Sequence, residues 1–396
     1  MAERIVILGA GHAGGATAIA LRELGFSGSI LVVGDEQHPP YERPTLSKEY
    51  LSGEASSPVW LAPAERWVEL GVTLKLGVEA VAIDRDKGEI RLADGSVEPF
   101  DKLVLAMGGR VRRLPLPDHP AVRYLRTADD ARAIAAATTP GARALVVGGG
   151  VIGLEAASTL RGLGLTITVI EAGERLLGRN VPAEAAEWLA AAHARIGVKV
   201  QLGRSLQELE DAADGSVIAR LDDSSTIEAD LVVVGIGIIP STEMAEAAGL
   251  PVAGGVLVGD DYRSPADDRI FIVGDLAARV RDGAAGRMET WAHAQTSARA
   301  AALAILGQPA EIEPTPWFWT AQCGHNLQIL GDPAAGNTVV ARGDTVRLYL
   351  RDGALVGAVC LDQPRDFATA RRLMGKTLIT ETAADPATDL RKAVAP

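Results

Sequence analysis

Two stretches of the chain repeat one pattern of hydrophobic, small and polar positions. Residues 4–36 and residues 143–172 each begin with a continuous apolar strand, pass through a glycine-rich turn and a helical segment, and end in a second apolar strand. Strands that are apolar at almost every position are typical of parallel sheets buried on both faces. The pattern therefore predicts two βαβ units, each belonging to an α/β domain.

Three later apolar strands also run into glycine-containing turns, at residues 103–109, 231–237 and 270–275. Glycine tolerates backbone conformations that other residues avoid, and it lets the backbone pass close to a bound molecule. These turns are therefore candidate binding segments.

The C-terminal part of the chain carries a different pattern. A helix is predicted over residues 292–306, and the proline-rich segment 309–316 follows it as a linker. Beyond the linker, short strands at residues 346–350 and 355–360 precede a helix near residues 364–375. Because this tail has no GxGxxG turn, we predict a separate small α+β domain.

Composition narrows the class of protein. The 396 residues carry 39 basic and 51 acidic side chains, a net charge of −12, which argues against a nucleic-acid-binding protein. The two cysteines, Cys323 and Cys360, form no CxxC pair, so we expect neither a disulfide framework nor a metal site. No apolar run reaches the roughly 18 residues of a transmembrane helix. The N-terminus enters a strand without a signal-like segment, and we expect a cytoplasmic protein that does not bind membranes.

The two glycine turns match the pattern GxGxxG between a strand and a helix. They read GAGHAG at residues 9–14 and GGGVIG at residues 148–153. In such a turn the first glycine permits the tight bend, the second lets the backbone approach a pyrophosphate, and the third lets helix and strand pack closely. The following helix offers its unpaired N–H groups to the phosphates. One such motif is a weak signal, but two in the expected context predict two dinucleotide sites.

An acidic residue stands at the end of the second strand of each unit, about twenty residues after the glycines. In the first unit it is Asp35 or Glu36, and in the second it is Glu171. A carboxylate there can bind a ribose 2′-hydroxyl and would repel the 2′-phosphate of NADPH. Arg175 could accommodate that phosphate and works against this inference, but we favour NADH. Two dinucleotides in one chain are most simply explained by hydride transfer from a nicotinamide to a flavin.

Further segments connect the chain to a known family. They read YERPTLSK at residues 41–48, YLRT at 124–127, VGD at 273–275 and PWFW at 316–319. Together with the order of the fingerprints, they resemble the oxygenase-coupled, NADH-dependent ferredoxin reductases over nearly the whole chain. The resemblance implies electron transfer from NADH through FAD to a [2Fe–2S] ferredoxin, which serves a Rieske aromatic-ring dioxygenase or a cytochrome P450. At Trp291 the chain resembles the reductases that serve aromatic-ring dioxygenases more than those that serve cytochromes P450.

The resemblance also implies a fold. It is α/β and glutathione-reductase-like, with two Rossmann-like dinucleotide-binding domains and a C-terminal α+β interface domain. The expected boundaries are 1–110 and 235–313 for the two parts of the FAD-binding domain, 111–234 for the NAD-binding domain and 314–396 for the C-terminal domain.

The fingerprints and the resemblance together assign the site residues. Those for FAD are Gly9, Gly11, Ala13, Gly14, Asp35, Arg43, Pro44, Lys48, Ala80, Arg126, Asp275 and Trp291. Those for NADH are Gly148, Gly150, Ile152, Gly153, Glu171 and Gly237, with Glu155 expected beside the nicotinamide.

Lys48 and Glu155 are the expected catalytic residues. An ammonium group near the flavin would stabilise the negative charge that arrives with hydride. Glu155 is a candidate ion-pair partner of Lys48 when NADH is bound. From the sequence alone, Lys48 can also be interpreted as a surface lysine in a loop, and Glu155 as an acid on the surface of a helix. Asp275 is expected to cap a helix that begins near Leu276.

The segment 43–50 contains no cysteine, although disulfide reductases of this fold need a cysteine pair there and peroxide-reducing relatives need one cysteine. The flavin must then hold the two electrons of the hydride and release them singly. Trp317 and Trp319 are candidates for the surface from which electrons leave, although aromatic residues are also ordinary core residues.

An acidic enzyme needs a local positive patch to dock a ferredoxin, which is typically acidic too. The candidate patch comprises Arg365, Arg371, Arg372 and Lys376, for which a solvated helix face is the plainer interpretation. Relatives usually carry Ser-Asp-Gln after PWFW, where this chain has Thr320-Ala321-Gln322, and the lost acid leaves the choice of ferredoxin open. A monomer or weak homodimer is expected.

Two alternative functions remain open. An NADH oxidase, or another pyridine-nucleotide flavin oxidoreductase of the same fold, would consume NADH without a carrier protein. A signalling protein resembling apoptosis-inducing factor shares the fold and the RPxLSK segment, but the acidic charge and the lack of a targeting segment and long insertions argue against it.

Overall fold

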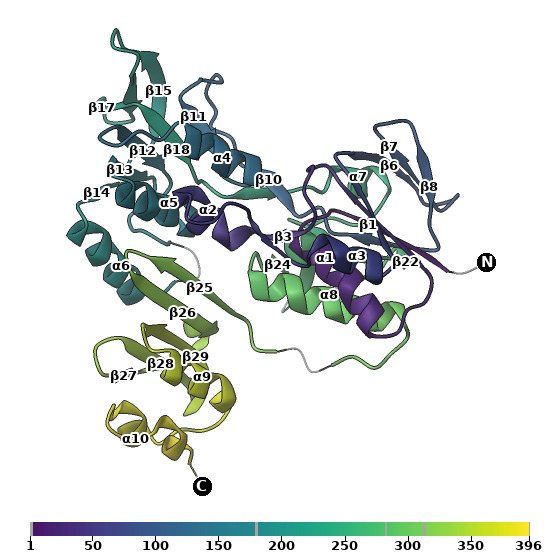
Figure 1. Cartoon of the computed structure of the whole chain (residues 1–396). Coiled ribbons are helices and arrows are strands. Elements are labelled where there is room, and N and C mark those ends of the chain that lie inside the picture. The colour runs from purple at the N-terminus through teal and green to yellow at the C-terminus, as the bar shows by residue number, and fades with distance from the viewer. Residues whose placement is uncertain (1–2, 179–180, 282, 312–313, 396) are drawn as a thin grey trace. The chain divides into compact units, whose positions relative to one another are not determined.

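The computed structural model describes residues 3–178, 181–281, 283–311 and 314–395, which belong to two compact units (Figure 1). Unit 1 comprises Met1–Pro44, Ser57–Arg110 and Ile238–Pro314, and unit 2 comprises Thr45–Ser56, Val111–Gly237 and Thr315–Pro396. The short segment Thr45–Ser56 therefore belongs to unit 2, although the chain on both sides of it belongs to unit 1. Part of the expected linker, residues 312–313, lies outside the described residues.

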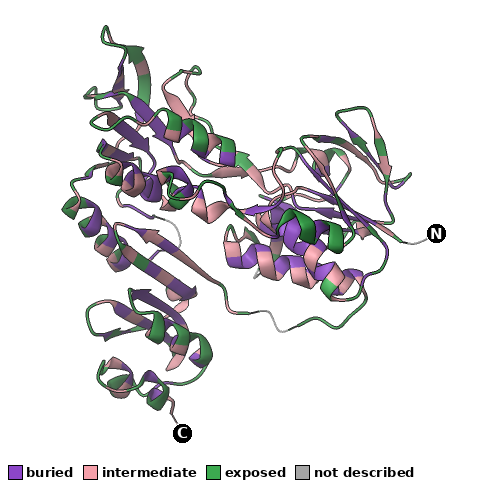
Figure 2. Ribbon diagram, viewed as in Figure 1, coloured by how far each residue is buried: buried purple, intermediate pink, exposed green. Residues whose placement is uncertain are grey.

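Unit 1 is built on a six-stranded, mostly parallel sheet. In spatial order its strands are β21 (Arg263–Ser264), β22 (Asp267–Ile272), β9 (Lys102–Leu105), β1 (Arg4–Leu8), β2 (Ser29–Gly34) and β5 (Val72–Leu76). Neighbouring strands run parallel, apart from the edge pair β21–β22. Strand β1 is apolar after Arg4 and fully buried, as the continuous apolar pattern predicts (Figure 2).

Two long helices of unit 1 lie side by side, α1 (His12–Glu23) and α8 (Trp291–Ile305) (Figure 1). Their buried positions are mostly alanine and glycine, and these small side chains let the two backbones approach closely. Among the described residues, no helix is long and apolar enough to cross a membrane.

Smaller elements complete unit 1. The remaining strands are β3 (Tyr41–Glu42), β4 (Val59–Trp60), β6 (Ala80–Asp84), β7 (Glu89–Leu92), β8 (Val97–Pro99), β10 (Gly109–Val111), β19 (Ile238–Pro240), β20 (Val256–Val258), β23 (Ala277–Arg281) and β24 (Ala284–Arg287). The short helices are η1 (Arg43–Thr45), α3 (Ala64–Glu69), α7 (Glu243–Ala247) and η2 (Gly274–Leu276).

Unit 2 contains a second parallel sheet, of five strands. In spatial order they are β11 (Val122–Tyr124), β18 (Leu231–Val234), β12 (Arg143–Val147), β13 (Thr166–Glu171) and β14 (Lys199–Leu202). An antiparallel sheet follows β14, made of β15 (Leu206–Asp211), β16 (Val217–Leu221) and β17 (Thr226–Ala229). The helices of this part are α2 (Glu49–Ser52), α4 (Ala128–Ala136), α5 (Val151–Gly162) and α6 (Ala183–Arg195).

The C-terminal domain, which belongs to unit 2, is an antiparallel sheet covered by short helices. Its strands, in spatial order, are β25 (Trp317–Gln322), β26 (His325–Gly331), β29 (Ala354–Leu361), β28 (Val346–Arg351) and β27 (Thr338–Arg342). Its helices are η3 (Pro333–Ala335), α9 (Pro364–Leu373), α10 (Thr380–Ala384) and η4 (Leu390–Ala393). Cys360 is fully buried in the core of this domain.

Both parallel sheets place their glycine turns in the same way. Strand β1 lies between β2 and β9, and β12 lies between β13 and β18. In each sheet, the strand after the glycine turn therefore lies on one side of the strand before it, and a later strand lies on the other side. In open parallel sheets, ligands bind outside the carboxyl ends of the strands at such a switch point. Each GxGxxG turn directly follows the central strand of its sheet, at this point.

Most of the expected elements are confirmed, including α8, β28, β29 and α9. The helix expected to begin near Leu276 is wrong. Residues 274–276 form the single 3₁₀ turn η2, with Asp275 inside it, and strand β23 follows directly. Strand β23 pairs with β20 and β24, and those partners take up the backbone groups that a helix would have bonded internally.

Candidate functional site

In unit 1, the GAGHAG turn joins β1 to α1. A Cβ at Gly9, whose φ is 108°, would lie 2.3 Å from the carbonyl oxygen of Ala106, and a Cβ at Gly14 would lie 1.9 Å from the carbonyl oxygen of Gly9. The fold itself therefore requires these two glycines. Gly11 differs, because its φ is −80° and a Cβ there would meet only a guanidinium nitrogen of Arg43, at 3.9 Å. Glycine at this position keeps space open before the N-terminus of α1, as an approaching pyrophosphate requires.

In unit 2, the GGGVIG turn repeats this geometry between β12 and α5. A Cβ at Gly148 would lie 2.5 Å from the carbonyl oxygen of Gly235, and a Cβ at Gly153 would lie 2.1 Å from that of Gly148. A Cβ at Gly150, whose φ is −79°, would meet only the oxygen of Gly235, at 3.9 Å. Neither α1 nor α5 has a side-chain cap at its first turn. The residues of both turns therefore fit a bound dinucleotide.

Glu171 ends β13 and lies directly beside the second turn. Its carboxylate accepts hydrogen bonds from the backbone N–H of Gly149 at 2.6 Å and of Gly173 at 2.7 Å. The guanidinium of Arg175 is directed elsewhere, toward loop carbonyl groups. It donates to the backbone oxygens of Leu177, Gly178 and Val181. The loop therefore already engages the guanidinium that could have accommodated a 2′-phosphate.

The two candidate acids after β2 have different surroundings. Glu36 forms an ion pair with Arg43 at 2.7 Å and accepts a hydrogen bond from the Tyr41 hydroxyl at 2.5 Å. Asp35 is exposed, and its Oδ1 accepts from the neighbouring backbone N–H of Glu36 at 3.1 Å. Asp35 therefore stays the better candidate for a ribose hydroxyl, and Glu36 holds the Arg43 side chain in place.

The start of α1 carries a buried histidine that the sequence analysis did not single out. Both ring nitrogens of His12 are buried without a hydrogen-bond partner among the described residues, and its ring centroid lies 5.3 Å from that of Trp291. Burial lowers the pKa of His12 to about 4, opposed by the Asp275 carboxylate and reinforced by Arg43. Unsatisfied buried nitrogens in this place fit a polar ligand that would complete them.

Turn η2 is hydrogen-bonded to α8 and lies against the start of α1. The backbone N–H of Gly274 donates to the Ser297 hydroxyl at 3.0 Å, and a Cβ at Gly274 would lie 2.8 Å from the Ala13 Cβ. Unit 1 thus gathers the first fingerprint, Asp275 and Trp291. Of the other expected FAD residues in this unit, Pro44 lies in η1, and Ala80 is buried at the start of β6.

Lys48 and Glu155 are joined in unit 2 as an ion pair, with 2.7 Å between Nζ and Oε2. The side chains are 14% and 3% exposed, so Glu155 is not a helix-surface acid. The structure contains the expected ion pair between these two side chains. Arg126 also belongs to unit 2, directly before Thr127, which caps α4 reciprocally with Asp130.

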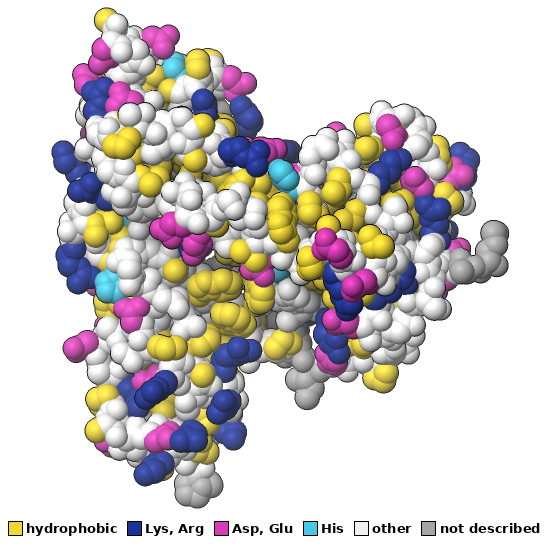
Figure 3. Space-filling model, viewed as in Figure 1, with side chains coloured by type: hydrophobic (Ala, Val, Ile, Leu, Met, Phe, Trp, Pro, Cys, Tyr) yellow, Lys and Arg dark blue, Asp and Glu magenta, His cyan; other side chains and the backbone are white. Residues whose placement is uncertain are grey.

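The candidate exit surface lies in the C-terminal domain. The rings of Trp317 and Trp319 stack at 5.4 Å, and the guanidinium of Arg371 lies 5.3 Å from the ring of Trp317. The four residues of the expected positive patch are all exposed, and Figure 3 shows Lys and Arg side chains gathered over this domain.

Three buried polar residues near Glu155 were missed from the sequence. Thr320 and Gln322, on β25, and His193, on α6, form hydrogen bonds that lead to the Glu155 carboxylate. One signal could have pointed to the first two. They occupy alternate positions of a strand, so they share a face, and that face is buried. No local pattern marks His193.

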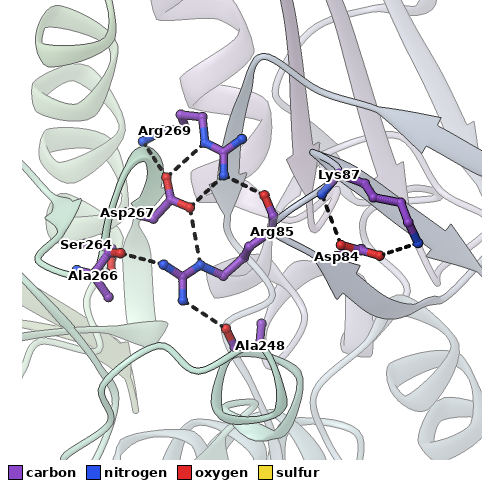
Figure 4. Close-up of polar contacts among 8 residues, drawn as sticks. All are labelled: Asp84, Arg85, Lys87, Ala248, Ser264, Ala266, Asp267 and Arg269. Carbon is purple, nitrogen blue, oxygen red and sulfur yellow. Dashed lines mark hydrogen bonds and ion pairs between the residues drawn. The ribbon is translucent and has the colours of Figure 1, made fainter.

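A cavity of about 540 Å³ elsewhere in unit 1 is bordered by the β6–β7 hairpin and the end of α7. Beside it, Arg85 and Arg269 both bind Asp267, and Arg85 also donates to the carbonyl oxygen of Ala248 (Figure 4). The hydrogen bond from Arg269, with help from Arg85, lowers the pKa of Asp267 to about 2. Because these arginine donors are used within the protein, the cluster is a structural brace between the hairpin and β22.

Comparisons with known proteins agree with this geometry. The family model described as pyridine nucleotide-disulphide oxidoreductase matches residues 3–298, and the model described as reductase C-terminal matches residues 317–394. The ferredoxin–NAD(+) reductase component of the p-cumate 2,3-dioxygenase system from Pseudomonas putida is 39% identical, over 98% of both chains. The corresponding component of the biphenyl dioxygenase system from Paraburkholderia xenovorans is 36% identical, over 95% of this chain and 94% of that one.

Among solved structures, the covalent putidaredoxin reductase–putidaredoxin complex matches with a TM-score of 0.93 and 30% identity, over 99% of this chain and 98% of that one. The expected fold and the expected resemblance to ferredoxin reductases of oxygenase systems are confirmed. The chain belongs to the pyridine nucleotide-disulphide oxidoreductase family.

Proposed function

We propose that the protein is an FAD-dependent NADH:ferredoxin oxidoreductase that supplies electrons to an oxygenase. The observation that carries this proposal is the pair of GxGxxG turns at the switch points of two parallel sheets, each with space before its second glycine. FAD and NADH are the cofactors that family membership implies. The relatives named as components of dioxygenase systems support a [2Fe–2S] ferredoxin as acceptor, serving a Rieske dioxygenase or a cytochrome P450.

FAD bound in unit 1 would supply a flavin that accepts hydride and gives up electrons one at a time. We assign its pyrophosphate to the N-terminus of α1, where Gly11 leaves room, and a ribose to Asp35. The other proposed contacts in this unit are Arg43, Pro44, Ala80, Asp275 and Trp291. Lys48 and Arg126 are proposed as FAD contacts on the family resemblance alone. His12 joins this set, because its ring nitrogens are buried beside the same turn.

We assign NADH to the turn in unit 2. The N-terminus of α5 would hold the pyrophosphate where Gly150 leaves room, and Glu171 would accept from a ribose 2′-hydroxyl. Ile152 and Gly237 complete the proposed lining. A 2′-phosphate would bring its charge against Glu171, which supports NADH over NADPH.

Lys48 and Glu155 are the proposed catalytic pair. The ammonium group of Lys48 would stabilise the negative charge that arrives with hydride. Glu155 fixes that ammonium through the 2.7 Å ion pair, so the charge needs little reorganisation during the reaction. Glu155 is also the proposed contact to the nicotinamide.

The cysteines do not support thiol chemistry. Burial raises the pKa of Cys360 to about 12, and burial also raises the pKa of Cys323. Both thiols are therefore protonated and unreactive at neutral pH. This supports electron transfer from the flavin directly to a protein acceptor, without a disulfide relay.

We place the ferredoxin dock on the C-terminal domain, at Arg365, Arg371, Arg372 and Lys376 beside Trp317 and Trp319. The stacking of Arg371 on Trp317 brings a positive charge and an aromatic ring to one surface. Reversing both charges, with Arg371→Glu and Arg372→Glu, should lower the rate of ferredoxin reduction and its salt dependence. Charge reversal at the exposed Arg66 and Lys87 of unit 1 changes the net charge equally and should have little effect. An unchanged rate in the first variant removes the patch from the proposal.

The experiment that tests the function is NADH-driven reduction of cytochrome c against a panel of [2Fe–2S] ferredoxins. We expect the rate to depend strongly on one or more of them. Equally fast NADH consumption by O₂ with no carrier would instead favour an NADH oxidase.

The remaining proposals concern the whole chain. We propose a cytoplasmic enzyme, because its cysteines are unpaired, as is usual in a reducing compartment. It would act as a monomer or weak homodimer, without binding nucleic acid or membranes. We retain 1–110, 111–234, 235–313 and 314–396 as the proposed domain boundaries.

A further inference from the structure

The carboxylate of Glu155 receives three hydrogen-bond donors. Lys48 Nζ donates to Oε2 at 2.7 Å, and the Ser47 hydroxyl donates to the same oxygen at 2.5 Å. The other oxygen, Oε1, accepts from the Thr320 hydroxyl at 2.7 Å. Glu155 lies on α5 of the parallel-sheet part of unit 2, and Thr320 lies on β25 of the C-terminal domain. The Lys48–Glu155 pair is therefore held partly by strand β25, which is remote from both residues in sequence.

The hydrogen bonds continue beyond Thr320. Gln322 Nε2 donates to Thr320 Oγ1 at 2.8 Å, and Gln322 Oε1 lies 2.6 Å from His193 Nε2. All three side chains are buried, with Thr320 and His193 at 0% exposure and Gln322 at 4%. Burial lowers the pKa of His193, opposed by its hydrogen bond to Gln322, so the imidazole is neutral at physiological pH.

The direction of every one of these hydrogen bonds follows from the Glu155 carboxylate at one end. An ionised carboxylate can only accept, so the Thr320 hydroxyl must donate to Glu155 and can then only accept from Gln322. The amide nitrogen of Gln322 therefore faces Thr320, and its oxygen faces His193. A neutral His193 must then carry its proton on Nε2. These hydrogen bonds form a row from His193 through Gln322 and Thr320 to Glu155, and every donor in the row points toward Glu155.

The row is suited to holding a charge and not to moving a proton. A side-chain amide cannot pass a proton along without losing its normal bonding, so Gln322 interrupts any proton path between His193 and Glu155. Aligned hydrogen bonds in a dry interior polarise one another and strengthen the last bond of the row. That last bond fixes the carboxylate that orients Lys48.

We propose that Thr320, Gln322 and His193 are positioning residues, which orient Glu155 and through it the Lys48 ammonium for hydride transfer from NADH. The proposal rests on the proposed function, which makes Lys48 and Glu155 the reactive pair. It also gives β25 a second role. The strand that carries Trp317 and Trp319 also supports the Lys48–Glu155 pair through Thr320 and Gln322, one and three positions after Trp319.

The first test compares Thr320→Val with Thr320→Ser in the flavin-loaded enzyme. Valine keeps the shape and removes the hydroxyl, whereas serine keeps the hydroxyl. We expect flavin reduction by NADH, followed by stopped-flow absorbance, to be slowed about tenfold in Thr320→Val and to stay within about twofold of wild type in Thr320→Ser. Flavin content and electron transfer from the pre-reduced enzyme to ferredoxin should be unchanged in both.

A second test uses distance along the row. Because the three residues are equally buried, damage to packing alone predicts similar losses at all of them. The positioning role predicts a gradient, with about tenfold slowing for Thr320→Val, about fourfold for Gln322→Leu and about twofold for His193→Phe. Thr138→Val is the control, because that hydroxyl bonds only within its own region, to the Ile134 carbonyl at 2.9 Å. Its rate should equal wild type.

Several outcomes overturn the proposal. A wild-type rate in Thr320→Val does so, as does a Thr320→Ser variant as slow as Thr320→Val, or equal losses along the row. If Thr320→Val does not fold, Gln322→Leu leaves Thr320 in place and decides the question, because a wild-type rate in it contradicts the row. Failure of the proposed function is distinguishable, since the wild-type enzyme would then either leave its flavin unreduced by NADH or pass no electrons from the reduced flavin to ferredoxin.

Discussion

The two glycine turns have nearly the same backbone, but their surroundings differ. At the fifth position of the motif, Ala13 in unit 1 is 8% exposed, whereas Ile152 in unit 2 is 42% exposed. Turn η2 covers Ala13, and Trp291 lies against the neighbouring His12. The turn in unit 2 instead has an acid, Glu171, bonded back to its own backbone.

We propose that this difference separates a cofactor that stays from a coenzyme that exchanges. A covered turn with unsatisfied buried nitrogens is stabilised when a ligand completes it, which suits a resident FAD. A turn with an exposed apolar residue and an acid already satisfied by the backbone can stand empty between turnovers, which suits NADH. The following predictions challenge this contrast, beginning with the largest effect.

The strongest test replaces the second glycine of each turn. Neither Gly11→Ala nor Gly150→Ala meets protein atoms closer than 3.9 Å, so both variants should fold. We expect Gly11→Ala to purify with little or no flavin. Gly150→Ala should purify yellow but with a KM for NADH raised by about tenfold or more. Absorbance spectra and steady-state kinetics measure both.

The control for these variants is Gly162→Ala, in α5, where a Cβ has open space and alanine favours the helix. It should keep both the flavin and the KM. If Gly11→Ala retains its flavin, or if Gly150→Ala loses it, the assignment of the two turns is wrong.

The second prediction concerns the ion pair in unit 2. Lys48→Met leaves the Glu155 carboxylate, which is 3% exposed, without its cation, and we expect the free energy of unfolding to fall by about 3 kcal/mol. In the double variant with Glu155→Gln, the loss should be smaller than the sum of the single losses. Urea unfolding measures both. The exposed pair Lys87–Asp84 is the control, with an expected loss below about 1 kcal/mol, and equal losses at the two pairs would contradict the buried role.

The third prediction concerns the pH dependence of stability that His12 gives to unit 1. The pKa of His12 is about 4 in the folded protein, below its ordinary value of 6.5, so the unfolded chain binds more protons between these values. The stability of the apoprotein should therefore fall as the pH drops through this window, by about 2.5 kcal/mol at pH 4.5. In His12→Gln this part of the loss should vanish. Urea midpoints at several pH values measure it, and identical profiles for the two proteins would reject the buried, neutral histidine.

The smallest expected effect is on coenzyme choice. Glu171→Gln removes the charge that opposes a 2′-phosphate, and we expect the ratio of kcat/KM for NADH over NADPH to fall by about tenfold. The flavin content should not change, because the residue belongs to the other turn. Glu174→Gln alters an exposed neighbour and should leave the ratio as it is. An unchanged ratio in Glu171→Gln would reject its ribose role.

Much of the fold could be predicted, because it follows from local sequence patterns. The continuous apolar strands and the glycine turns each lie within a short stretch, and both βαβ units, α8 and α9 followed from them. The helix expected after Asp275 failed for the opposite reason. Its outcome depends on pairing of β23 with β20, which lies about twenty residues earlier in the chain.

The candidate site divides in the same way. The fingerprint glycines and Glu171 could be named because their chemistry requires fixed spacing. Glu155 and Lys48 needed the family resemblance. Thr320, Gln322 and His193 could not be found, because their importance comes only from contacts between α5, α6 and β25, and no spacing rule connects those elements.

The central claim is that electrons enter as hydride from NADH and leave singly to a protein. The most direct measurement is an anaerobic count of ferredoxin reduced for each NADH oxidised, with the flavin-loaded enzyme in catalytic amount. The account predicts about two ferredoxins per NADH, because a hydride carries two electrons and a [2Fe–2S] cluster takes one. Ferredoxins that stay oxidised, with NADH consumed only after O₂ is admitted, would contradict it.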